Sequence, residues 1–119
     1  MLKAFIASME TIKDLLVVED AVIVAGCDPV IRSFNITTGE KKQFLGHKGW
    51  VYCLAYHNGF LFSGGDDNMV RCWHLESSRQ IEILEAHTNG VMAIELCRGL
   101  LITSSFDKYV ITWDIEEIE

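Results

Sequence analysis

The sequence predicts an all-β protein assembled from repeated sheets of four short antiparallel strands. Residues 46–73 and 86–113 carry the same residue types in the same order, and the two segments start about 40 residues apart, a length typical of one such sheet. Short runs rich in Val, Ile, Leu, Phe and Tyr alternate with turn-forming residues, and no stretch keeps a helical period. We therefore expect a structural unit that is copied along the chain.

The first part of the chain carries a third, degraded copy of the repeat. Aligning Asp28 with Asp67 and Asp107 matches residues 12–28 to residues 91–107 without a gap. The repeat therefore covers nearly the whole chain, which we treat as one domain, 1–119. Its expected parts are an outer strand at 2–7, a first four-stranded unit at 12–45, a second at 50–86, and the inner strands of a third at 91–115.

The boundaries between the expected strands fall at residue pairs that favour tight turns. Pro29, the single proline, comes directly after Asp28 at the start of a strand, where its missing N–H costs little. Turns are expected at Glu19-Asp20, Thr38-Gly39, Asn58-Gly59, Gly65-Asp66, Ser77-Ser78 and Arg98-Gly99.

Composition indicates a globular chain. With 119 residues, 50% hydrophobic and 23% charged, it can bury one modest core, and its apolar runs are too short to span a membrane. Residues 1–7 hold one Lys and a very short apolar run, so we expect neither a secretory signal nor a membrane anchor. The four cysteines form no CxxC pair, which favours reduced thiols and a cytoplasmic or nuclear location.

The charge balance argues against a nucleic-acid partner. The net charge is -7, from 10 basic and 17 acidic residues. The basic residues are scattered apart from Lys41-Lys42 and Lys48, whereas binding to a phosphate backbone needs clustered Lys and Arg. The acidic end, with Glu116, Glu117 and Glu119, is interpreted as a solvated tail.

Two segments resemble blades of the WD-repeat β-propeller family. Residues 45–75 contain a Gly-His dipeptide, a small-residue Ser-Gly-Gly run, the Asp of a tight turn and the Trp of the third strand. Residues 85–115 repeat this pattern and end in the Trp113-Asp114 pair of the family. The joint spacing of four residue types, seen twice, is specific, whereas Trp-Asp alone is not. The resemblance implies propeller blades of four antiparallel strands.

Physical chemistry explains why these four residue types occur together. A Trp on a buried strand brings an indole N–H that needs an acceptor. A neighbouring hydroxyl can accept it and donate its own hydrogen to a His, which in turn donates to a carboxylate in a turn. By resemblance to the family, we assign one network to His47, Ser63, Asp67 and Trp73, and a second to His87, Thr103, Asp107 and Trp113.

The degraded first copy lacks this polar network. It has Phe34 in place of Trp, Val24 in place of the hydroxyl residue and Ser8 in place of His, while it keeps Asp28. A phenyl ring has no N–H that needs an acceptor, so the donor and its partners are lost together. We expect plain apolar packing at this position.

The same residues allow two alternative interpretations, catalysis and metal binding. His47, Ser63 and Asp67 are the three residue types of a hydrolase triad, and the later copy repeats them with Thr. However, Ser63 lies in a strand run rather than on a nucleophile elbow, and no oxyanion donor is indicated. No second His or Cys stands at ligand spacing for a metal. We therefore expect no enzymatic activity, no metal and no cofactor.

Counting strands predicts an incomplete ring. Residues 2–7 align with residues 81–86, the outer strand of a blade, whereas the last copy ends after its inner strands near Ile115. In the family such a displaced first strand completes the last blade. The chain then supplies three blades, and closed propellers usually have four to eight. We expect either a fragment of a longer propeller or a half-ring that pairs with a second copy.

By resemblance, the chain is expected to be a rigid platform that binds other proteins. Recognition in the family is usually on the face where the loops before the first strands meet the Asp turns. An aromatic, Met and acidic surface there suits an interface, although Trp50 and Tyr52 could instead pack between blades. The alternative function is a building block whose only partner is itself. The candidate binding residues are Trp50, Tyr52, Asp66, Met92, Phe106 and Cys27.

Overall fold

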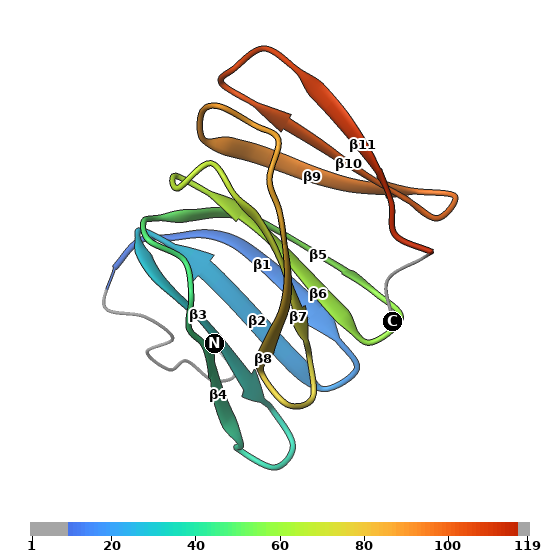
Figure 1. Cartoon of the computed structure of the whole chain (residues 1–119). Coiled ribbons are helices and arrows are strands. Elements are labelled where there is room, and N and C mark those ends of the chain that lie inside the picture. Colours follow the sequence, from blue (N-terminus) through green and yellow to red (C-terminus); the bar gives the residue numbers. More distant parts are fainter. Residues whose placement is uncertain (1–9, 117–119) are drawn as a thin grey trace.

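The computed structural model describes residues 10–116, and within this range it contains only strands, turns and loops. The all-β prediction is confirmed: the described strands form antiparallel sheets of four, four and three strands, which we call blades 1, 2 and 3 (Figure 1). The outer strand predicted at 2–7, together with Ser8 and the last three residues, lies outside the described part. In that part no helical segment has the length and apolarity that a membrane crossing requires.

Each blade is a simple up-and-down meander, in which consecutive strands pair. Blade 1 consists of β1 (Ile12–Val18), β2 (Ala21–Gly26), β3 (Asp28–Asn35) and β4 (Lys41–Phe44). Blade 2 consists of β5 (Val51–His57), β6 (Phe60–Gly65), β7 (Val70–His74) and β8 (Arg79–Leu84). Blade 3 consists of β9 (Val91–Cys97), β10 (Leu100–Ser105) and β11 (Val110–Asp114).

Two-residue turns join the first two strands of every blade, as the turn residues predict. In blade 2, His57 pairs with Phe60, so that Asn58 and Gly59 alone form the connection. Both residues have positive φ, 52° and 86°, as a type I′ turn requires. This left-handed conformation explains why Asn and Gly stand there. The turn matches the right-handed twist of the two strands and fixes their register.

The hydrophobic cores lie between the blades. Ile23 and Ile31 of blade 1 pack with Leu61 and Trp73 of blade 2, and a second cluster joins blade 2 to blade 3. Blade 2 is therefore covered on both faces, whereas blades 1 and 3 stand at opposite ends of the array (Figure 1). Because residues alternate between the two faces of a strand, β5, β6 and β7 of blade 2 each contribute to both cores.

Polar contacts also cross between blades along the innermost strands. The Asp14 carboxylate accepts the Leu54 N–H at 2.8 Å, which ties β1 to β5. At the corresponding position of blade 2, the Cys53 thiol lies 3.7 Å from the Val91 carbonyl of β9. Burial raises the pKa of the Cys53 thiol to about 12, so it stays protonated and packs as a small apolar group.

A substitution at Gly64 should test the tightness of the joint between blades 2 and 3. A Cβ at Gly64 would lie 2.6 Å from Val91 Cγ1 and 2.9 Å from Cys53 Sγ. We expect Gly64→Val to lower the free energy of unfolding by about 1–3 kcal/mol, because the blades must separate to accommodate it. Urea unfolding measures this change. Ser104→Val, at the same repeat position in blade 3, is the control, and an equal loss in both variants would contradict the explanation.

Candidate functional site

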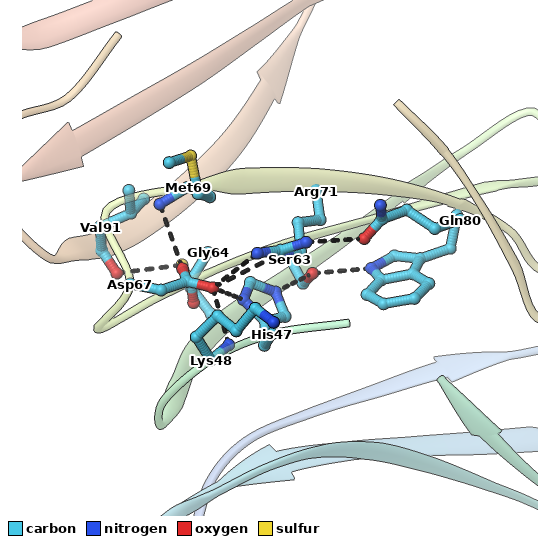
Figure 2. A network of polar contacts seen from close by, with 11 residues as sticks. His47, Lys48, Ser63, Gly64, Asp67, Met69, Arg71, Gln80 and Val91 are labelled. Carbon is cyan, nitrogen blue, oxygen red and sulfur yellow. Dashed lines mark hydrogen bonds and ion pairs between the residues drawn. The ribbon is translucent and has the colours of Figure 1, made fainter. Parts of the chain in front are cut away.

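Blade 2 brings together the four residues of its predicted network (Figure 2). The Trp73 indole N–H on β7 donates to Ser63 Oγ on β6 at 2.8 Å. Ser63 Oγ lies 2.6 Å from His47 Nε2, and His47 Nδ1 lies 3.0 Å from Asp67 Oδ2. Because the serine hydroxyl accepts from the indole, its own hydrogen is free to donate to Nε2, and Nδ1–H then donates to the carboxylate.

Blade 3 contains the same chain of contacts with Thr in place of Ser. The Trp113 indole N–H donates to Thr103 Oγ1 at 3.0 Å, and Thr103 Oγ1 lies 2.8 Å from His87 Nε2. His87 Nδ1 lies 2.7 Å from Asp107 Oδ2. Both histidines are buried, and so are both hydroxyl residues. Each network links two strands with the loop before the blade and the turn after its second strand.

The two turn carboxylates are held in their charged form. Burial alone would raise the pKa of Asp67, but the hydrogen bonds from His47 and from the Lys48 and Met69 N–H groups outweigh it and hold the pKa well below its usual range. For Asp107, burial is outweighed by the Tyr109 N–H, His87 and the Thr88 N–H, and the pKa falls to about 2. Each carboxylate thus links the loop before its blade to the turn after the second strand of that blade.

Sequence reasoning missed Arg71, which joins the network of blade 2. Its guanidinium donates to Asp67 Oδ2 through Nε at 3.3 Å and Nη2 at 3.1 Å, and to Gln80 Oε1 of β8 at 2.9 Å (Figure 2). The side chain is buried. A signal was present, since Arg follows the turn Asp by four residues in blade 1 as well, where Arg32 Nη1 pairs with Asp28 at 2.7 Å. Blade 3 has an isoleucine there.

The degraded position of blade 1 is apolar. Val24 and Phe34, which stand where blade 2 has Ser63 and Trp73, are both buried. No indole N–H has to be satisfied here, and the pair Asp28 and Arg32 is what remains of the polar network among the described residues. Ser8, at the position of the histidine, lies outside the described residues.

The geometry does not suit the triad interpretation. Ser63 is fully buried, and its hydroxyl is engaged by the Trp73 indole on one side and His47 on the other, which leaves no approach for a substrate carbonyl. A nucleophile must reach its substrate, whereas this hydroxyl bridges two neighbours. Among residues 10–116, no group of three or more His, Cys, Asp and Glu side chains is arranged to hold a metal ion.

The six candidate binding residues lie along one rim, at the ends of the blades near the Asp turns. Trp50 is 47% exposed and Phe106 is 60% exposed, while Met92 and Asp66 are also exposed and Tyr52 and Cys27 are half-buried. The Asp66 N–H donates to the Trp50 carbonyl at 2.8 Å, which joins the turn to the start of β5. Trp50 is thus about half exposed and belongs to neither hydrophobic core cluster.

Asp66 lies close to rim residues of both blade 2 and blade 3. The Tyr52 hydroxyl donates to Asp66 Oδ1 at 3.2 Å, and burial together with the Asp66 charge raises the pKa of Tyr52, which keeps its hydroxyl protonated. A Cβ built on Gly90 would lie 3.7 Å from Asp66 Oδ1 and 3.6 Å from Phe106 Cδ2, so side chains of blades 2 and 3 converge over Gly90. Cys27 belongs to blade 1 and Met92 to blade 3.

A cleft of about 420 Å³ lies at the opposite ends of blades 1 and 2, and none of the predicted site residues lines it. Its walls are mainly polar and include Asp20, Glu40 and Tyr56. Lys42 crosses it, with Nζ donating to the Glu76 carbonyl at 2.6 Å. The turns between first and second strands form this side of the molecule, so the cleft is separate from the rim.

Removing the shared hydroxyl of blade 2 should destabilise the protein through the partners that it leaves behind. We expect Ser63→Ala to lower the free energy of unfolding by about 1–3 kcal/mol, because the Trp73 N–H and His47 Nε2 stay buried. Adding Trp73→Phe should cost less in this background than in the wild type, since the indole donor is then gone. Urea unfolding of the four proteins measures the coupling. Additive losses would contradict the network.

Acid should destabilise the protein through the turn carboxylates. Unfolded Asp has a pKa of about 3.9, and both folded values lie lower, so this stabilisation is complete above about pH 4 and is lost as the pH falls toward 2 and below. Urea unfolding between pH 7 and pH 2 should show Asp67→Asn to be less stable at pH 7 and less sensitive to acid than wild type. Glu85→Gln, an exposed carboxylate, is the control. Parallel wild-type and Asp67→Asn profiles would refute the assignment.

Comparisons with known proteins agree with this architecture. Residues 39–74 and 78–114 match the family model of the WD domain, G-beta repeat. Transducin beta-like protein 3 of Mus musculus is 29% identical over 101 residues, which cover 79% of this chain and 13% of that protein. Ribosome biogenesis protein YTM1 of Kluyveromyces lactis is 26% identical over 100 residues, covering 72% of this chain and 22% of that protein. The chain thus spans less than a quarter of either relative.

A solved structure shows the same fold. The computationally designed Ika4 protein superposes with a TM-score of 0.83 at 19% identity, covering 91% of this chain and 68% of that chain. A likeness at this identity concerns the fold alone. The family match covers more than half of the chain, and together with the three antiparallel sheets it shows that the chain belongs to the WD40 repeat β-propeller family.

Proposed function

We propose that the chain is a non-catalytic scaffold that binds other proteins through the rim formed by Trp50, Tyr52, Asp66, Met92, Phe106 and Cys27. The observation that carries this proposal is the exposure of Trp50 and Phe106 beside the Asp66 carboxylate. Large aromatic side chains and Met are enriched at the centres of protein interfaces, and an exposed group of them on a folded domain marks an interaction surface. WD40 repeat proteins are typically non-catalytic scaffolds.

The rigid backbone that carries the rim residues also favours this function. Asp67, the anchor of the blade 2 network, follows Asp66 directly, and His47 lies in the loop that leads to Trp50. Side chains carried by a backbone that is already fixed lose less entropy when a partner binds. The networks thus prepare the rim for binding and perform no chemistry themselves.

The class of partner and the location are part of the proposal. One relative is named as a ribosome biogenesis protein, and a protein-binding role here is compatible with work inside a larger assembly. All four cysteines are free thiols, which supports the cytoplasm or the nucleus. The acidic net charge of -7 argues for protein rather than nucleic-acid partners.

A second candidate function is ring assembly, with another copy of the chain or the remainder of a longer propeller as the partner. The observation in its favour is that the sheets at both ends of the array expose apolar residues, among them Leu15 and Val110. Propeller blades normally bury these surfaces against a neighbouring blade.

Removing the two rim aromatics should separate binding from folding. We expect Trp50→Ala combined with Phe106→Ala to abolish capture of partner proteins in a pull-down from cell extract, while thermal unfolding stays nearly unchanged because both side chains are exposed. Ile36→Ala combined with Ile83→Ala, two other exposed apolar residues, is the matched control. A large loss of stability in the rim variant would assign the aromatics to the core. Wild-type protein that returns only itself would favour the ring-assembly function.

A further inference from the structure

We propose that the cleft between blades 1 and 2 binds the side chain of an arginine that a partner protein presents. The cleft, of about 420 Å³, lies at the ends of these blades opposite the rim, and no rim residue lines it. The inference therefore adds a second contact to the proposed scaffold and does not depend on the rim. The volume falls within the range of about 300–1,000 Å³ that is typical of ligand sites.

Small and polar residues of blade 1 open this cleft. Ala21 and Ser33 line it, and the residues at the same positions of blade 2, counted from the turn Asp, are Phe60 and Cys72. Phe60 and Cys72 pack in the apolar cluster that joins blade 2 to blade 3. The joint between blades 2 and 3 thus carries apolar side chains where the joint between blades 1 and 2 carries a cleft.

Ser33 places a nearly buried hydroxyl in the cleft. The residue is 5% exposed, and among the described residues no hydrogen bond engages its hydroxyl. In this part of the chain every fully enclosed side-chain nitrogen or oxygen has a partner, so Ser33 Oγ opens into the cleft that it lines. Buried polar groups of native proteins are normally hydrogen-bonded, and a donor of a ligand would satisfy this one.

The charges around the cleft favour a cationic ligand. Its described lining includes one lysine, Lys42, and four carboxylates, those of Glu19, Asp20, Glu40 and Glu76. Glu19 and Asp20 form the turn between β1 and β2, and Glu76 lies in the turn between β7 and β8, on the same side of the molecule (Figure 1). The net charge of -7 adds long-range attraction for a basic partner.

Lys42 shows which chemistry the oxygens of the cleft accept. Its Nζ donates to the Glu76 carbonyl at 2.6 Å and lies 3.6 Å from Glu40 Oε1, so that an ammonium group already lies among them. The Glu76 carboxylate and the Ser33 hydroxyl have no hydrogen-bond partner among the described residues. Acceptors for a second cation therefore remain beside the first.

The apolar part of the lining suits the long side chain of arginine. Val18 and Leu75 line the cleft and pack against the core between blades 1 and 2, so they lie at its inner side. The aliphatic stem of an arginine can cover them, while its five N–H donors reach several oxygens at once. Tyr56, which is half-buried in the same lining, offers an aromatic ring on which a guanidinium can stack.

Titration of the full chain with a capped peptide tests the proposal. The probe is acetyl-Gly-Gly-Arg-Gly-Gly-amide, whose only charge is the guanidinium, and NMR follows the backbone amide signals of the isotope-labelled protein. Saturable shifts should centre on Ala21, Ser33 and Gly59, and the same peptide with glutamine in place of arginine should cause none. Shifts centred elsewhere, or equal shifts with both peptides, would overturn the proposal. Methylguanidinium chloride should bind more weakly than the arginine peptide, and equal affinity would assign the cleft to a free small cation instead.

Removing the lysine of the cleft should strengthen binding of the arginine peptide. Lys42→Met takes away the ammonium that competes for the Glu76 carbonyl and the Glu40 carboxylate, and we expect an affinity about threefold higher. Lys41→Met is the matched control, because it changes the net charge equally, whereas Lys41 lies over the Phe34 ring and outside the cleft lining. Equal effects of the two substitutions would indicate a general effect of charge and would contradict the proposed site.

Filling the cleft should abolish binding of the peptide. Ala21→Phe introduces the residue type that blade 2 has at this position, and circular dichroism checks that the variant is folded. Glu40→Gln combined with Glu76→Gln is a second test that adds no bulk, and it should weaken binding about tenfold. Glu85→Gln combined with Glu95→Gln, two exposed carboxylates outside the cleft lining, is its control and should bind as wild type. Wild-type affinity in both cleft variants would refute the proposal.

The same titration separates this proposal from the function of the rim. Trp50→Ala combined with Phe106→Ala leaves the cleft lining unchanged, so this variant should bind the arginine peptide as wild type even where it no longer captures partner proteins. Loss of peptide binding in the folded rim variant would place the arginine contact on the rim and overturn the proposal for the cleft. Partner capture by the rim variant would contradict the proposed function of the rim alone.

Discussion

A buried indole N–H must have an acceptor, and this requirement organises blade 2. Trp73 is fully buried between blades 1 and 2, where it packs edge-on against Phe44 at a centroid distance of 5.8 Å. Its N–H is satisfied by Ser63, and the serine in turn needs His47 and the carboxylate beyond it. The ring also explains Gly46, because a Cβ there would lie 2.9 Å from the indole and 2.6 Å from Gln80 Oε1.

The consequences of this network reach the surface of the molecule. The loop before β5 and the turn after β6 are held together by the bonds of His47 and Lys48 to Asp67, in addition to the backbone bond from the Asp66 N–H to the Trp50 carbonyl. The next residues along each segment carry the exposed rim. A structural requirement in the core thus places Trp50 and Asp66 next to each other on a backbone that is already fixed, as the proposed binding function would need.

Much of the fold could be predicted from the sequence, because short strands separated by turn residues leave a strong local signal. Both polar networks could be assigned by resemblance to the WD-repeat family, because the four residue types occur twice at the same spacing. Arg71 was missed although Arg32 repeats its spacing from the turn Asp, since an Arg on a strand is usually directed to solvent and the burial of Arg71 depends on Gln80 in another strand. The contact between Asp14 and the Leu54 N–H links two blades and leaves no local pattern. The exposure of Trp50 likewise depends on how neighbouring blades pack.

Unequal burial along the repeat implies unequal stability along the array. Blade 2 shares a core with a neighbour on each side and has the most extensive polar network, whereas blades 1 and 3 each share one core among the described residues. In arrays of this kind stability is approximately the sum of intrinsic terms and nearest-neighbour contacts, so the end blades should open before the middle one.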